Sequence, residues 1–170
     1  YAANEGASVI SLSFAGEGYD ADLKKAIEYA HEKNAVVVVS ASNDEENLDF
    51  ASTYPAKFQM PHLLTITAST PTDELMEGSN WGKKTVAMLA PGEEISGIWG
   101  DQYDIGSGTS QAAAVVAGIA GLVRSANPSL TAADTVRILR ASVRKVPGLE
   151  KSCQTGGIVD AYSAVVLARR

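Results

Sequence analysis

The sequence is short of cysteine, histidine and positive charge. Its only cysteine is Cys153, so an internal disulfide and a metal site built from several cysteines are excluded. His31 and His62 are the only histidines, and 14 Lys and Arg face 20 Asp and Glu, for a net charge of -6. This balance argues against nucleic acid or an anionic membrane as the main partner. No apolar run reaches the roughly 20 residues that a membrane span needs.

The remaining composition is that of a globular domain. Hydrophobic residues make up 45% and charged residues 20% of 170 residues, which suits one domain or a large piece of one. The chain begins at Tyr1 in the middle of a pattern, without an initiator Met or a signal peptide, so we expect it to be a piece of a longer protein.

Strand and helix patterns alternate in the first part of the chain. Four consecutive valines in 35–41 predict a central strand buried on both faces, and 7–13 is a second uncharged strand. Between them, an amphipathic helix begins near Asp20. Strand, helix and strand in succession predict a right-handed crossover, and therefore an α/β fold with a mostly parallel sheet flanked by helices.

The remaining segments follow from similar signals. The stretch 42–62 lacks a regular pattern and is long enough to be a functional loop. We expect a frayed helix end at 1–6, strands at 63–68 and 85–89, a hairpin at 95–105, a capping box at Thr131 that opens a helix to about Val143, and a short terminal helix.

One helix start is suited to nucleophilic chemistry. After Ser107-Gly108-Thr109-Ser110-Gln111, no charge appears until Arg124, which predicts a helix buried on all sides. Its first N–H groups and the positive end of its dipole favour negative charge developing near Ser110. The competing interpretation is structural, because Ser and Thr are ordinary N-caps.

Several segments, in one order, resemble the subtilisin-like serine proteases. Weaker matches lie at 54–56 and 79–82, and the main ones are 9–16, 36–43, Ala90-Pro91-Gly92, 108–113 and 116–118. The resemblance covers the C-terminal part of the family's catalytic domain and implies an incomplete three-layer domain over residues 1–170. The segments that carry the family's catalytic Asp and His have no counterpart here.

The resemblance implies a serine endopeptidase with Ser110 as nucleophile and Asn43 as oxyanion donor. For Asn43 the alternative is a loop residue that bonds its own backbone. Neither His31 nor His62 lies in the family's His motif; His31 is expected on the surface at a helix end and His62 in a loop. We therefore expect the isolated chain to lack a base, to be inactive, and to expose the four-valine strand and the central helix.

Substrate contacts follow from the same resemblance. A peptide substrate would lie between an edge segment, 13–16, and a segment that forms one wall of the pocket, 40–43. Ala15 and Ser42 stand where Gly is usual, and their side chains should narrow the cleft. Asp44, Glu45 and Glu46 predict a preference for Lys or Arg before the scissile bond, or are simply a solvated loop. The implied substrate-binding residues are Ser13, Phe14, Ala15, Gly16, Ser40, Ala41, Ser42 and Thr109.

Two alternatives remain open. Ala114-Val115 replaces the family's usual Pro-His, which favours a non-catalytic, peptide-binding pseudo-protease. Gly106-Ser107-Gly108 favours a nucleotide-binding domain, although Gln111 stands near the place of the third glycine. The resemblance also implies calcium as a cofactor, a cis bond at Tyr54-Pro55, and a secreted or vesicular location; no Asp-rich loop appears, so no metal residues are assigned.

Overall fold

A computed structural model describes the backbone of residues 1–170 and the side chains of all of them except Trp99. Ten strands and four helices are formed in these residues. In chain order they are β1 (Val9–Leu12), β2 (Gly16–Glu17), α1 (Ala21–Glu32), β3 (Val36–Ser40), β4 (Thr53–Tyr54), β5 (Leu63–Ser69), β6 (Met88–Pro91), β7 (Ile95–Trp99), β8 (Gln102–Gly106), α2 (Thr109–Ala126), α3 (Ala132–Ala141), β9 (Arg144–Lys145), β10 (Gly157–Ile158) and α4 (Ala161–Ala168).

The main sheet has six strands in the order β1-β3-β5-β6-β10-β9. All neighbours are parallel except β9, which runs antiparallel to β10. Val38 of β3 lies opposite Ser11 of β1 on one side and Leu64 of β5 on the other. The prediction of an α/β fold with a mostly parallel sheet is confirmed.

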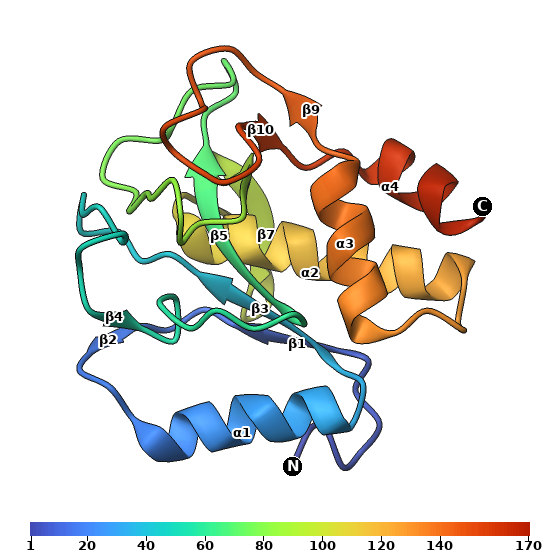
Figure 1. Ribbon diagram of the computed structural model, residues 1–170. Helices are drawn as coiled ribbons and strands as arrows, with labels where there is room; N and C mark the ends of the chain where they lie inside the picture. Colours follow the sequence, from blue (N-terminus) through green and yellow to red (C-terminus); the bar gives the residue numbers. More distant parts are fainter.

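Helices cover both faces of this sheet (Figure 1). Because successive side chains of a strand point to opposite faces, Val37 and Val39 of β3 pack with Ile27 of α1. Val36 and Val38 pack on the other face in a core that includes buried residues of α2, α3 and α4. The result is the three-layer arrangement that the family resemblance implies.

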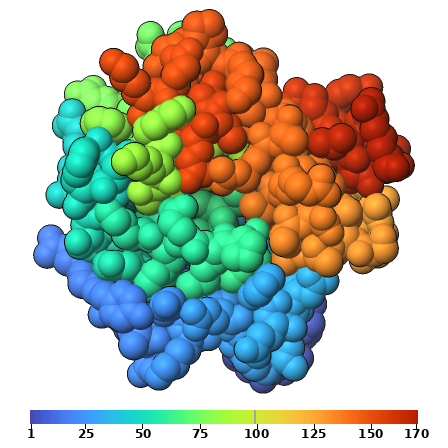
Figure 2. All heavy atoms as spheres, viewed as in Figure 1, coloured from blue at the N-terminus to red at the C-terminus, as the bar shows by residue number. Residues whose placement is uncertain are grey.

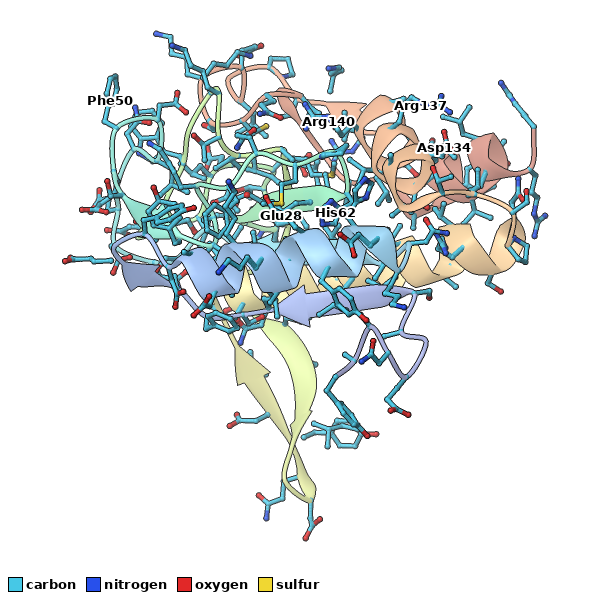
Figure 3. The ribbon with its side chains drawn as sticks, turned by 60° about the horizontal axis from the view of Figure 1, so that its bottom comes forward. Glu28, Phe50, His62, Asp134, Arg137 and Arg140 are labelled. Atoms are coloured by element: carbon cyan, nitrogen blue, oxygen red, sulfur yellow. The ribbon has the colours of Figure 1, made fainter. Side chains whose placement is uncertain are left out.

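A two-stranded hairpin extends from this body. β7 and β8 pair antiparallel around Gly100, and Figure 3 shows them projecting away from the three layers. The hairpin was expected at 95–105, and the structure confirms it. Its last strand leads directly into the start of α2, so the hairpin stands beside the serine-bearing helix terminus.

Three local expectations need comment. Residues 2–6 form turns and no helix, because a short segment gains too few hydrogen bonds to offset helix nucleation. The four-valine strand is not exposed: β1 and β5 flank β3, and all five of its residues are buried. The partly exposed strand is instead β1, at the edge of the sheet. The central helix α2 does have an exposed face, on which Leu122 is 56% exposed. The capping box at Thr131 is confirmed, with Asp134 as its reciprocal partner.

Candidate active site

Ser110 lies in the first turn of α2 and is half-buried. The helix behind it is anchored by buried residues on the sheet-facing side, among them Ala112, Ala113 and Val116. The first N–H groups of a helix have no partner within the helix, and they carry the positive end of its dipole. The Ser110 hydroxyl is therefore held beside donors that favour a developing negative charge.

Two glycines bring this helix start close to the sheet. The Gly108 N–H donates to the Gly92 carbonyl at 2.7 Å, and Gly108 has a φ of 151°, a conformation that favours glycine. A Cβ on Gly92 would lie 2.5 Å from the Ala68 Cβ and 2.8 Å from the Gly108 oxygen. A side chain at Gly92 would therefore displace the turn that presents Ser110.

Asn43 lies directly beside the same helix start. It follows the end of β3, and its Oδ1 accepts a hydrogen bond from the Thr109 N–H at 3.0 Å. A Cβ on Gly108 would lie 3.5 Å from both amide atoms of Asn43, so the amide rests against the turn itself. With Oδ1 occupied by the helix, the Nδ2 group is the end of the amide that can donate to a ligand.

A buried asparagine organises the loop that carries Asn43. Asn80 is fully buried; its Oδ1 accepts from the N–H groups of Asp44 and Glu46, both at 2.9 Å, and its Nδ2 donates to the Ala41 carbonyl at 2.9 Å. These bonds fix the backbone on both sides of Asn43. Sequence reasoning missed this positioning role, although 79–82 matched the family weakly.

Ser42 adopts the backbone conformation that explains why Gly is usual at this position. Its φ is 77°, in the left-handed region where a Cβ costs about 1–2 kcal/mol. Its hydroxyl donates to Asp44 Oδ2 at 2.6 Å. The serine therefore holds a strained turn and orients a carboxylate next to Asn43.

An acidic hollow lies next to this turn. It has a volume of about 240 Å³ and is lined by Ala15, Gly16, Glu17, Ser42, Asp44, Glu46 and Thr53. Three of these side chains are carboxylates, and no lysine or arginine is among the lining residues that the structure describes. Three predicted substrate-binding residues, Ala15, Gly16 and Ser42, thus meet in one hollow with two of the acidic residues predicted to rim a specificity pocket.

The other predicted substrate-binding residues are placed differently. The Ser13 hydroxyl donates to the Ser110 carbonyl at 3.3 Å, so this residue lies at the helix start. Ser40, Ala41 and Thr109 are buried, and a ligand in the cleft could meet only their backbone groups. Phe14 is 51% exposed and lines a different hollow.

The two histidines lie together at the opposite end of the strands. Their rings stack with centroids 4.5 Å apart, and His62 Nε2 is 2.9 Å from the Ile27 carbonyl. His62 immediately precedes β5 and is buried, whereas Asn43 and Ser110 lie beyond the carboxyl ends of the strands. Burial lowers the pKa of His62; the hydrogen bond to the Ile27 carbonyl opposes this shift and the charge of His31 adds to it, so that the pKa is lowered overall. Neither histidine is placed to act on Ser110.

The described residues contain neither a cluster that could bind a metal nor a helix that could span a membrane. Within them, no three His, Cys, Asp or Glu side chains gather in a way that could hold a metal ion, so no residue is assigned to the calcium that the resemblance implies. In the same part of the chain, none of the helices combines the length and apolarity needed to cross a bilayer.

The segment before α2 also bears on the nucleotide-binding alternative. Gly106 closes β8, a strand of the antiparallel hairpin, whereas a dinucleotide loop follows a parallel strand of the main sheet. The geometry therefore does not favour a nucleotide site at 106–111. A serine at a helix start, beside an asparagine at the end of a parallel strand, is instead the arrangement that the family resemblance implies.

Comparison with known proteins places the chain in a family. The model of the Subtilase family matches residues 1–156. The chain belongs to this family.

The curated relatives include proteases from several organisms. The chain is 34% identical to thermitase of Thermoactinomyces vulgaris, covering 97% of this chain and 56% of thermitase. It is 31% identical to subtilisin-like protease 2 of Plasmodium falciparum, covering 94% of this chain and 13% of that protein. The chain thus spans only part of the relatives that it matches.

Solved structures share the fold. A solved structure of proteases from Pseudoalteromonas arctica matches with a TM-score of 0.80 and 27% identity. The match covers 95% of this chain and 51% of that one. The A-subunit of the AB5 toxin from E. coli matches with a TM-score of 0.83 and 24% identity, covering 96% and 60%. The subtilisin-like fold expected from the sequence is confirmed.

Proposed function

We propose that this chain carries the nucleophile and the oxyanion donors of a serine endopeptidase of the subtilisin type. The observation that carries the proposal is the hydrogen bond from the Thr109 N–H to Asn43 Oδ1, which holds the Asn43 amide beside the turn that presents Ser110. A nucleophile and a fixed amide donor at one helix start are the two elements that acyl transfer requires besides a base.

The chemistry follows from these positions. Ser110 Oγ forms a bond to the carbonyl carbon of the scissile peptide while a base takes its proton, and the carbonyl oxygen becomes an oxyanion. Asn43 Nδ2 and the Ser110 N–H donate to that oxyanion. The peptide C–N bond then breaks, the amine leaves with the proton from the base, and water hydrolyses the acyl-serine by the same steps.

The base must come from another segment. His31 and His62 lie at the far end of the strands, so we place the catalytic Asp and His of the domain outside residues 1–170. Residues 1–170 then form the C-terminal part of the peptidase domain, and its remaining part is the partner that this chain requires. The partly exposed edge strand β1 and the exposed Leu122 of α2 are surfaces that such a part could cover.

The substrate side of the site favours a basic residue before the scissile bond. Glu17, Asp44 and Glu46 line one small hollow beside Asn43, and Ser42 orients the Asp44 carboxylate. A Lys or Arg side chain that enters this hollow would meet three carboxylates.

The proposal also includes calcium as a cofactor and a secreted or vesicular location. Both are based on the family resemblance alone.

The proposal is tested in the full-length protein by hydrolysis of a peptide library. We expect cleavage that is lost, by at least about a thousandfold, in Ser110→Ala. The matched control is Ser125→Ala, which removes an exposed hydroxyl from the same helix and should leave turnover unchanged. Binding of peptides without cleavage would overturn the proposal in favour of a pseudo-protease.

A further inference from the structure

A second, larger hollow lies at the amino ends of the strands. Its volume is about 590 Å³, and Figure 2 shows the surface hollowed where residues near 60 meet the orange residues of α3 and the following loop. Leu63 and Thr65 of β5 lie in its wall, and α3 forms another side. None of its lining residues belongs to the site around Ser110 and Asn43.

The charges around this hollow are all positive. Arg137, Arg140 and Lys145 line it, and among the described lining residues there is no Asp or Glu. Arg137 and Arg140 stand three positions apart on α3, and both line the hollow. In a chain of net charge -6, a hollow with three cations and no carboxylate requires an explanation.

Of the three lining cations, Arg140 is the one that is half-buried and has no anion partner among the described residues, whereas Arg137 and Lys145 are exposed. Arg137 is paired with Asp134 at 3.0 Å, and the Lys145 ammonium donates to the Thr155 carbonyl. Arg140 is half-buried, and within the described part of the chain it has no ion-pair partner within 4.0 Å. Burial lowers the pKa of Arg140. Partial burial removes water from the Arg140 guanidinium, so an anionic group of a ligand in the hollow would stabilise its charge.

Two further features describe the ligand. The Oε1 atom of Gln154 is buried and has no donor among the described residues, whereas its Nε2 donates to the Lys84 carbonyl. Met60, Pro61 and Val136 form an apolar part of the lining. A fitting ligand therefore carries an anionic group for Arg140, an N–H or O–H donor for Gln154, and an apolar body.

We propose that this hollow binds a small organic carboxylate with an apolar side chain and an adjacent amide N–H, the chemistry of an N-acylated amino acid. The carboxylate accepts hydrogen bonds from the Arg140 guanidinium, the ligand N–H donates to Gln154 Oε1, and the side chain packs on Met60 and Val136. The site is separate from the proposed catalysis, so a result for one leaves the other untouched.

N-acetyl-leucine is the probe, titrated by calorimetry into the full-length protein. N-acetyl-leucinamide removes the charge, 4-methylpentanoate removes the N–H, and N-acetylglycine removes the apolar side chain. We expect N-acetyl-leucine to bind saturably and each of the three analogues to bind more weakly. The affinity should fall by about tenfold or more for the amide and by less for the other two analogues. Equal binding of acid and amide would overturn the proposal, and so would the absence of any binding.

Variants place the binding in this hollow. Arg140→Gln should lower the affinity for N-acetyl-leucine by about tenfold or more, and Arg140→Lys should retain part of that affinity. Arg169→Gln removes an exposed arginine outside the hollow and should change nothing. The melting temperature without ligand checks that each variant folds. Unchanged affinity in a folded Arg140→Gln would show that the ligand binds elsewhere.

Discussion

The two ends of the parallel strands differ in charge and in chemistry. Beyond the carboxyl ends lie Ser110, Asn43 and a hollow lined by carboxylates such as Asp44. At the amino ends lie the stacked histidines and a hollow lined by cations such as Arg140. One sheet therefore separates an acidic hollow, beside the proposed nucleophile Ser110, from a basic hollow.

This separation is the reason why we propose that neither of the two histidines serves as a base for Ser110. His62 is fixed by the Ile27 carbonyl and by stacking on His31, at the strand ends remote from Ser110. The histidines lie at the amino ends of the strands, and Ser110 lies beyond the carboxyl ends. A change of side-chain rotamer therefore cannot bring either imidazole to the Ser110 hydroxyl.

Replacing Asn43 tests the carboxyl end directly. In an active full-length protein, Asn43→Leu should lower kcat by about a hundredfold or more with little change in KM, because the amide bonds the oxyanion mainly in the transition state. Steady-state kinetics on one peptide measures the change. The control is Asn4→Leu, which removes only an exposed hydrogen bond from the Tyr29 hydroxyl and should leave kcat unchanged. An effect confined to KM would contradict the assigned role.

Replacing Asn80 tests how the Asn43 loop is held. Asn80→Ala removes three hydrogen bonds to backbone groups and should lower the free energy of unfolding by about 3 kcal/mol, with a fall in kcat. The control is Asn127→Ala, which also loses three hydrogen bonds, but far from the loop. Denaturant melts and turnover should separate the two: both variants lose stability, and only Asn80→Ala loses turnover. Equal turnover in the two variants would show that Asn80 does not position Asn43.

Neutralising the acidic hollow tests its selectivity. The double variant Asp44→Asn, Glu46→Gln should lower kcat/KM by about tenfold for a peptide with Lys before the scissile bond and leave a matched Leu peptide unchanged. The effect should shrink as salt is added. Glu45→Gln removes one charge from the same loop but lies outside the hollow, so it should have little effect. A Lys preference that survives in the double variant would refute the role of the hollow.

The buried histidine makes stability depend on pH. With Nε2 donating to the Ile27 carbonyl, His62 Nδ1 is buried without a partner among the described residues, so protonation is unfavourable in the folded state. Its pKa is lowered, so the unfolded chain binds the proton first. Stability should therefore fall as the pH drops below about 6.5, by at most about 1.4 kcal/mol per pH unit. Melts of His62→Gln should lose this slope; an unchanged slope would assign it to other groups.

The sequence predicted the elements that short-range patterns encode. The uncharged valine run indicated β3, and the small apolar run indicated α2 with Ser110 at its start. Asn80 was missed, because a buried asparagine bonded to a loop almost forty positions earlier leaves no local pattern. The basic hollow was also missed, since Gln59, Arg140 and Gln154 meet only in the folded chain.

Titration with a fluorophosphonate serine reagent tests whether residues 1–170 contain a base for Ser110. Residues 1–170 alone and the full-length protein are each titrated, with Ser110→Ala as the blank. The proposed function predicts rapid, stoichiometric labelling of Ser110 in the full-length protein only, because the hydroxyl is a poor nucleophile without an adjacent base. Rapid labelling of Ser110 in the monomeric 1–170 chain would contradict it, since a base would then have to be present within these residues.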